Sequence, residues 1–344
     1  MDRFPTFELV VERELSGLRI DSFLIRHFRN YSSWRIQRVV RAGAATIDEA
    51  PATETDRVRV GQRVRIQLLE PPDKLLAADP LSIPILYADP WIAVVHKPAG
   101  IIAHPTGEHH TRTLANILQH WMDERAPLRG LMRPGLVHRL DRQTSGVMVV
   151  AMQHMYHRPL SMTFENGRIS KTYIALVEGL LATDAGSIDL PIGRARTGQH
   201  VLMSARGDAL EPRPASTRFR VLERFEHHTL VEARPATGRN HQIRVHFAQI
   251  GHPLVGDEFY EAFGKIKPLR MAGEVDETGE FDEDGIVTGL PIRRHALHAA
   301  RLELAHPISQ VWMEFRSPLP DDFEATIRQL KQTAAAIRLG GRLL

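Results

Sequence analysis

The stretch Gly135-Leu-Val-His-Arg-Leu-Asp-Arg-Gln-Thr-Ser-Gly146, followed directly by Val147-Met-Val-Val-Ala151, decides the interpretation of this chain. Residues 147–151 are apolar and rich in β-branched side chains, which indicates a short buried strand, and residues 144–146 are turn formers that can fix the loop before it. Asp141 is thereby positioned at the mouth of a strand. Three potential cations flank it: His138, Arg139 and Arg142. Spacing alone leaves open whether Asp141 is a catalytic carboxylate or part of a structural ion pair.

Length and composition limit the class of protein. The chain has 344 residues, of which 43% are hydrophobic, so two domains around substantial cores are expected. No apolar run is long enough to span a bilayer and the N-terminus lacks a signal-peptide pattern, so we expect a cytoplasmic protein. The absence of cysteine excludes disulfides, thiol nucleophiles and cysteine-ligated metals.

Charge is distributed unevenly along the chain, although the net charge is only +3. No acid occurs between Asp21 and Asp48, an interval that contains five arginines. Residues 271–290 are the opposite, with seven acids and no Lys or Arg, and we expect there an acidic surface insertion that is partly disordered. The basic interval is suited to a phosphate backbone and the acidic run is not.

Residues 1–74 are predicted to form a compact RNA-binding domain. Ser32 or Ser33 can cap a helix that Gly43 ends, with an apolar face predicted from Trp34, Ile36, Val39 and Val40. Short strands are expected at 45–47, 57–60 and 63–68. Three arginines recur every three residues along the helix and are predicted to contact RNA: Arg35, Arg38 and Arg41. The alternative is a solvated arginine face without a ligand.

A linker at 75–83 and a second domain at 84–344 are expected to follow. The predicted strands of the second domain are 85–87, 92–96, 147–152, 170–177, 217–222 and 229–233, the last two forming a hairpin. Its predicted helices are 113–124, 157–164, 240–250 and 322–337. Because strands and helices do not alternate strictly, we expect an α+β domain on a mixed, largely antiparallel β-sheet.

Several motifs resemble those of one enzyme family. The string His138-Arg139-Leu140-Asp141-x-x-Thr144-Ser145-Gly146 resembles the signature of the RluA-type pseudouridine synthases. Three more matching segments occur in the family's order: 96–105 with His-Lys-Pro-Ala-Gly, Lys171-Thr-Tyr173, and 237–253 with Thr-Gly-Arg-Asn-His-Gln-Ile-Arg-Val-His. Four ordered motifs within residues 84–318 make a chance match improbable. Residues 18–69 resemble the S4-like RNA-binding domain that often precedes the catalytic domain in this family, apart from Asp48-Glu-Ala in place of an Asn-Gly turn.

The resemblance implies the pseudouridine synthase fold and an isomerisation of uridine in RNA. That reaction is redox-neutral and needs no cofactor, and the chain lacks the common nucleotide-loop and metal-site motifs, so neither cofactor nor metal is expected. Asp141 would be the catalytic carboxylate. Arg244, on a predicted helix that starts beside a polar loop, would keep it ionised and oriented, and Tyr173 would pack against the uracil ring.

The remaining cations near these motifs are predicted to bind RNA. Arg139 would fill the gap that a flipped base leaves, by stacking its guanidinium there. Lys97, Lys171 and Arg239 are assigned to phosphates. For Arg244 the alternative is an ordinary surface cation of a helix, and for Tyr173 a half-buried strand tyrosine.

The expected substrate is large-subunit ribosomal RNA, with transfer RNA as the close alternative, and the expected oligomeric state is a monomer. A glycosidase or nucleosidase would require a second carboxylate at a defined separation, and the candidates Glu165 and Glu178 share no motif with Asp141. A non-catalytic RNA-binding or assembly factor remains a further alternative. A missing Asp, Tyr or Arg in the motifs would have favoured it.

Overall fold

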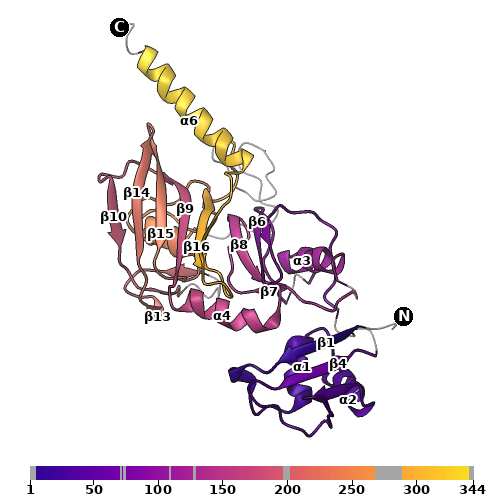
Figure 1. The fold of residues 1–344 in the computed structure, drawn as a ribbon. Coiled ribbons are helices and arrows are strands. Elements are labelled where there is room, and N and C mark those ends of the chain that lie inside the picture. The colour runs from indigo at the N-terminus through magenta and orange to yellow at the C-terminus, as the bar shows by residue number, and fades with distance from the viewer. Residues whose placement is uncertain are drawn as a thin grey trace. The chain divides into compact units, whose positions relative to one another are not determined.

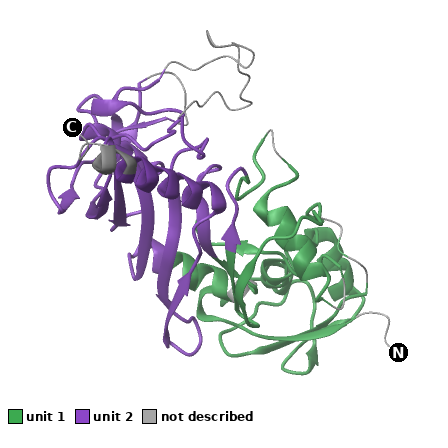
Figure 2. Ribbon diagram, turned by 90° about the horizontal axis from the view of Figure 1, so that it is seen from above, with its two compact units in different colours: residues 1–95, 101–139, 149–162 green, residues 96–100, 140–148, 163–344 purple. Residues whose placement is uncertain are grey.

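The structure, a computed structural model, describes residues 5–340 except 70, 71, 73, 74, 108, 109, 127, 128, 197–201 and 268–288. It divides into two compact units, coloured separately in Figure 2. Unit 1 comprises residues 1–95, 101–139 and 149–162, and unit 2 comprises residues 96–100, 140–148 and 163–344. Unit 1 thus includes the predicted RNA-binding domain and the first strands of the predicted catalytic domain. The domain limits at 74 and 84 stay a prediction, and the acidic insertion lies almost wholly outside the described residues.

The N-terminal part of unit 1 has its own sheet and core. Its strands are β1 (Thr6–Val10), β2 (Ala45–Ile47), β3 (Ala50–Pro51) and β4 (Arg63–Gln67), in the order β1-β4-β2-β3. Two helices, α1 (Ile20–His27) and α2 (Ser33–Arg41), pack on it (Figure 1). The predicted strand at 57–60 is wrong: Val58 bonds to the segment before α1, as donor to Leu18 and acceptor from Gly17, and not to a sheet strand.

Helix α2 confirms the predicted cap and corrects its predicted apolar face. The Ser32 hydroxyl accepts from the Arg35 amide, and Gly43 follows the helix with a φ of +74°. Ile36, like the valines at 39 and 40, is buried, whereas Trp34 is 58% exposed. At about 100° per residue Trp34 lies on the side of the helix opposite Ile36, so one face cannot bury both.

The remainder of unit 1 contains short strands and helices, some of which continue into unit 2. Strand β5 (Ile85–Ala88) pairs antiparallel with β6 (Ile92–Lys97), and β7 (Gly135–Leu136) pairs with β8 (Ser145–Ala151). Helix α3 (Leu114–Asp123) begins with a capping box in which Thr113 and Asn116 bond reciprocally. Helix α4 (His154–Glu165) includes the predicted helix at 157–164. These elements confirm the predicted strand and helix positions to within a few residues.

The sheet of unit 2 has the predicted mixed character. Its order is β10 (Ala185–Ile188), β14 (Thr217–Arg224), β15 (His228–Pro235), β9 (Ile169–Glu178), β16 (Leu297–Ala305) and β8, and β17 (Trp312–Arg316) also pairs with β16. Every pairing is antiparallel except that of β16 with β8. The hairpin of β14 and β15 was predicted, whereas the central strand β16 and its neighbour β17 were not.

Two helices cover opposite faces of this sheet. Helix α5 (Gln242–Gln249) packs through Ile243 and Phe247 against Ala175 and Tyr173 of β9. Helix α6 (Asp321–Gly340) packs through its apolar side against Leu176, the next residue on that strand. Since successive strand residues point to opposite faces, β9 presents Tyr173 on the α5 face and its even-numbered neighbours on the α6 face.

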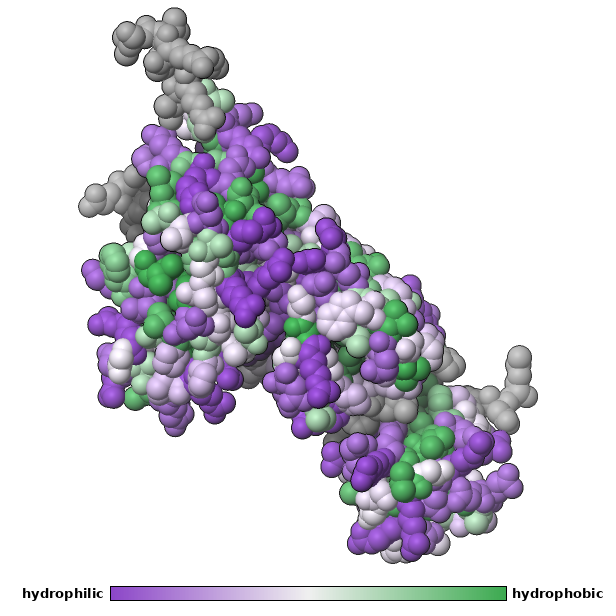
Figure 3. All heavy atoms as spheres, turned by 60° about the vertical axis from the view of Figure 1, so that its left-hand side comes forward, coloured by the Kyte–Doolittle hydropathy of each residue, from purple (hydrophilic) through white to green (hydrophobic). Residues whose placement is uncertain are grey.

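A smaller three-stranded sheet completes unit 2, with β11 (Ile192–Arg194) between β12 (Met203–Ser204) and β13 (Leu210–Arg213). Among the described residues, no helix has the length and apolarity needed to cross a membrane. On the face drawn in Figure 3, apolar residues occur in small groups among hydrophilic ones.

Candidate active site

Asp141 lies in a loop of unit 2 that is fixed by close backbone contacts. The Thr144 amide donates to the Asp141 carbonyl over 3.1 Å, and β8 begins one residue later. Gly146 has a φ of +126°, and a Cβ there would lie 2.3 Å from the Ala299 carbonyl of β16. Only glycine allows this approach. The Asp141 side chain itself is 20% exposed, so its carboxylate can be reached from solvent.

The residues after Asp141 are held by hydrogen bonds with side chains of residues 294–298, where the chain enters β16. Arg294 donates through Nη1 to the Gln143 carbonyl at 2.8 Å and through Nη2 to the Ser145 hydroxyl at 3.3 Å. Its guanidinium is itself held by Asp322, with contacts of 2.7 and 3.1 Å. Two histidines further along bond the same loop: His295 contacts the Thr144 hydroxyl and His298 the Ser145 hydroxyl.

Arg244 joins Asp141 to a second carboxylate, that of Asp257, which no sequence motif indicated. Its Nη1 donates to Asp141 Oδ2 over 3.2 Å, whereas Nε and Nη2 each donate to Asp257 over 2.8 Å. Asp257 is fully buried and Arg244 is 1% exposed. Burial alone would lower the pKa of Arg244, but the charge and hydrogen bonds of Asp257, and then Asp141, raise it. Arg244 therefore stays charged in an orientation that Asp257 fixes.

Tyr173 lies on β9, near enough to Asp141 for the carboxylate charge to act on its hydroxyl. Burial and the charge of Asp141 together raise the pKa of its hydroxyl, which therefore stays protonated at neutral pH. The ring is partly buried and packs beside the α5 residues Ile243 and Phe247. The structure thus brings together the three predicted catalytic residues Asp141, Tyr173 and Arg244 within unit 2.

Aromatic residues after α5 complete the surroundings of Arg244. The guanidinium carbon lies 5.2 Å from the ring centre of Phe259 and 5.3 Å from that of Tyr260. The Tyr260 hydroxyl bonds to His241 Nδ1 at 2.7 Å, and His241 Nε2 lies 3.9 Å from Asp141 Oδ1. His241 has a φ of +53°, so the helix begins at Gln242 and not at the predicted residue 240.

The burial of Lys97 corrects its assignment to a phosphate. Its ammonium is fully buried and donates to the backbone carbonyls of Pro98 and Arg142, and the Arg142 carbonyl also accepts from the Gly100 amide. Burial, with a smaller contribution from Arg294 and against the charge of Asp141, lowers the pKa of Lys97 to about 7. Lys97 thus holds the residue next to Asp141 and cannot reach RNA.

The other predicted RNA contacts differ in exposure. Lys171 is half-buried and donates to the Thr237 carbonyl over 2.9 Å, and burial lowers its pKa to about 8. Arg239 is half-buried and donates to the Pro214 carbonyl, whereas Arg139 is exposed. Their roles toward RNA stay predictions.

The arginines of α2 combine charge with an exposed ring. Arg38 is exposed and lies over the Trp34 ring, 4.6 Å from its centre. Arg41 is exposed and paired with Glu54, and Arg35 is half-buried. An exposed tryptophan beside arginines is a surface on which a nucleotide base can stack. The role of the three arginines remains a prediction.

Asp257 is the second carboxylate near Asp141, so it must be considered as the second catalytic acid of a glycosidase. Asp257 uses both oxygens on Arg244, and Oδ1 also accepts from the amides of Phe259 and Tyr260. A carboxylate so occupied and buried is not available as a second acid or base. Among the described residues, no cluster of His, Asp and Glu is suited to hold a metal ion.

Comparison with known proteins identifies the family. Residues 92–249 match the family described as RNA pseudouridylate synthase. An uncharacterized RNA pseudouridine synthase of Bacillus subtilis is 34% identical over 94% of this chain and 98% of its own length. This chain belongs to the RNA pseudouridine synthases. Ribosomal large subunit pseudouridine synthase D of Pseudomonas aeruginosa is 35% identical over 94% of this chain and 95% of its length.

Solved structures agree with this assignment. The chain resembles human RNA pseudouridylate synthase domain containing 4 with a TM-score of 0.55 and 25% identity, over 72% of this chain and 92% of that one. The predicted fold class and reaction class are confirmed. The protein is an isomerase that converts uridine in RNA to pseudouridine, and its motifs place it with the RluA-type enzymes.

Proposed function

We propose that this enzyme modifies uridines of large-subunit ribosomal RNA, with Asp141 as its catalytic carboxylate and without a cofactor. The observation that carries the catalytic assignment is the 3.2 Å contact between Asp141 and Arg244, an arginine locked on its other side by Asp257. Relatives named ribosomal large subunit pseudouridine synthase D, which match the chain over nearly its whole length, support the choice of ribosomal RNA.

The reaction requires little beyond the groups of this site. The bond between ribose C1′ and uracil N1 breaks, the base turns, and C1′ bonds to C5, which loses its proton while N1 gains one. An ionised Asp141 is suited to act at the sugar, and the fixed positive charge of Arg244 keeps it ionised and oriented. The protonated hydroxyl of Tyr173 is suited to donate a hydrogen bond to uracil or move a proton, while its ring packs on the base.

We further propose that the N-terminal part of unit 1 is an S4-like domain that binds the RNA and that the enzyme acts as a monomer. The exposed Trp34 and Arg38 pair and the neighbouring Arg35 and Arg41 support this role, because base stacking and phosphate contacts both favour such a surface. Arg139, Lys171 and Arg239 are proposed to contact the RNA around the target uridine.

Mapping of pseudouridines in total RNA from cells with and without the gene tests the substrate. We expect one or more positions of large-subunit RNA to lose pseudouridine without the gene and to regain it when the wild-type gene, but not Asp141→Asn, is restored. Loss confined to transfer RNA would establish the alternative substrate. An unchanged map in all RNAs would contradict the proposed function.

A further inference from the structure

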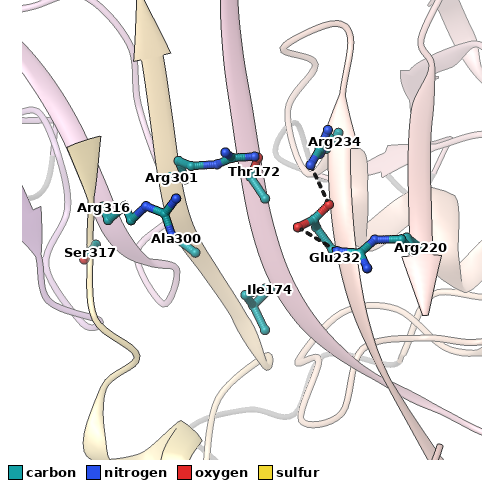
Figure 4. Close-up of a pocket in the computed structure, with 9 residues that line it drawn as sticks. All are labelled: Thr172, Ile174, Arg220, Glu232, Arg234, Ala300, Arg301, Arg316 and Ser317. Atoms are coloured by element: carbon teal, nitrogen blue, oxygen red, sulfur yellow. Dashed lines mark hydrogen bonds and ion pairs between the residues drawn. The ribbon is translucent and has the colours of Figure 1, made fainter. Parts of the chain in front are cut away.

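The α6 face of the unit 2 sheet carries an arginine-lined hollow of about 460 Å³ beyond the part that α6 covers. Figure 4 shows Arg301 and Arg316 on one side and Arg220 and Arg234 on the other, with Thr172 and Ile174 of β9 between them. The four arginines come from four different strands: β14, β15, β16 and β17. Four separate strands thus direct guanidinium groups to one place on the sheet.

Two glutamates hold these arginines in pairs. Glu232 lies 3.5 Å from Arg220 and 2.8 Å from Arg234, and Glu314 pairs with both Arg301 and Arg316. Glu303 adds a longer contact of 3.8 Å to Arg301. Each guanidinium has five N–H donors, so these contacts leave most donors unused while limiting the orientation of each group.

The hollow is separate from the candidate active site. Thr172 and Ile174 flank Tyr173 on β9, so their side chains point away from the face on which Tyr173 packs against α5, the helix of Arg244. Exposure is high where a ligand would approach: 51% for the Arg234 side chain and 73% for Arg316. No residue of this hollow takes part in the site around Asp141.

We propose that this hollow binds the phosphate backbone of the RNA substrate at a place remote from the target uridine. The inference rests on the proposed RNA-modifying function. Arginine is the side chain best suited to phosphate oxygens, because its planar group donates two parallel hydrogen bonds. Exposed ion pairs are worth little in water, so a phosphate can take up free donors without a large loss. A long structured RNA that continues past the active site supplies such phosphates.

The test compares two double variants of the full-length enzyme. Arg234→Gln/Arg316→Gln removes two exposed, ion-paired arginines of the hollow. Arg125→Gln/Arg129→Gln removes two that match them in exposure, at 54% and 72%, and in pairing with an acid, but that lie in unit 1. Binding is measured against salt with a large-subunit RNA transcript and with a short stem-loop around the mapped uridine.

The hollow variant should bind the long transcript about tenfold more weakly, because two guanidinium groups no longer donate charge-assisted hydrogen bonds to phosphates. Its salt slope should fall by about 0.7 to 0.9 for each phosphate that the protein no longer neutralises. The stem-loop affinity and the single-turnover rate at saturating RNA should stay at wild-type values. The proposal is overturned if the hollow variant binds the long transcript as tightly as the wild type does. It is also overturned if this variant loses as much affinity for the stem-loop, or if the control variant loses as much affinity for the long transcript. If the proposed function is wrong, the wild-type enzyme itself forms no pseudouridine in the large-subunit transcript, and this result is distinct from any change in binding.

Discussion

Two regions of unit 2 use arginine in opposite ways. Around Asp141 and its loop, Arg244 and Arg294 are 1% and 6% exposed, and each donates two hydrogen bonds to an aspartate other than Asp141, to Asp257 and Asp322 respectively. On the α6 side, Arg234 and Arg316 are mostly exposed and share glutamates with other arginines. The residue type is the same and the surroundings differ.

The difference in burial implies that the two groups of arginines have different functions. Removal of Arg244 would leave the buried carboxylate of Asp257 uncompensated, which costs about 3–5 kcal/mol, so Arg244 serves as a fixed point for Asp141. Arg294 is also buried, although its partner Asp322 is 34% exposed, and it holds the loop after Asp141. An exposed pair is worth about 0.2–1 kcal/mol and can exchange partners. We therefore expect loss of buried arginines to change rates and loss of exposed arginines to change affinity.

Arg244 should give the largest effect among the arginines. Its removal leaves Asp141 without the positive charge that keeps it ionised and oriented, so the saturated single-turnover rate should fall at least about a hundredfold. Arg244→Ala also leaves the buried carboxylate of Asp257 without its charge partner. The double variant Arg244→Ala/Asp257→Asn is therefore measured beside it, with a thermal melt as a check of folding. A normal saturated rate with weakened binding would show that Arg244 is a phosphate contact, like the exposed arginines.

Arg294 should act on rate through the catalytic loop without touching RNA. Arg294→Lys keeps the charge but loses the planar group that reaches both Gln143 and Ser145, so the loop should be less well oriented and the saturated rate lower by about tenfold. Arg316→Lys is the matched control on the exposed side and should leave that rate unchanged. Equal rates for the two variants would show that burial does not distinguish these arginines.

The buried cation Lys97 should affect the pH dependence of stability. Its pKa is about 7 in the folded protein and about 10.4 in an unfolded chain, so the unfolded state binds more protons between these values. Stability of the wild type should therefore rise with pH from about 7 to 10, by up to about 1.4 kcal/mol per pH unit, relative to Lys97→Met. Urea unfolding of both proteins across this range measures the difference. A difference independent of pH would show that Lys97 is not buried as described.

The exposed arginines of α2 should give the smallest effect. Arg38→Gln/Arg41→Gln should weaken RNA binding severalfold and lower the salt slope by about one to two, with an unchanged saturated rate. Filter binding between low and physiological salt measures both quantities. If affinity and slope match the wild type, the arginine face of α2 is solvated and the N-terminal part of unit 1 has another role.

The sequence was most informative where a residue type and a motif coincided. Asp141, Tyr173 and Arg244 were predicted because each lies in a motif that resembles the RluA-type signature; loop, strand and helix position alone left other interpretations open for each of them. Their catalytic roles stay predictions, and the structure shows the contact between Asp141 and Arg244. Asp257 could not be predicted, since it follows Arg244 by thirteen residues in a loop whose path only the fold determines. Its local signal was weak: an acid between Gly256 and a short segment with two aromatic residues.

Burial was the property that sequence predicted least well. Lys97 lies in a family motif and carries a charge, which favoured a phosphate contact, but its ammonium bonds two backbone carbonyls inside unit 2. Trp34 was assigned to a core and is exposed. Strand β16 was missed although Leu302, Glu303 and Leu304 alternate, because its first half, with His298 and two alanines, has no strand periodicity.

The variant Asp141→Asn tests whether Asp141 performs the chemistry or holds the RNA. Asparagine keeps the shape and hydrogen bonding of the side chain and removes its negative charge. Pseudouridine formation and binding are measured on the same large-subunit RNA transcript for the variant and the wild type. We predict no detectable product with an affinity close to that of the wild type. Continued conversion of uridine by Asp141→Asn would show that another group performs the chemistry.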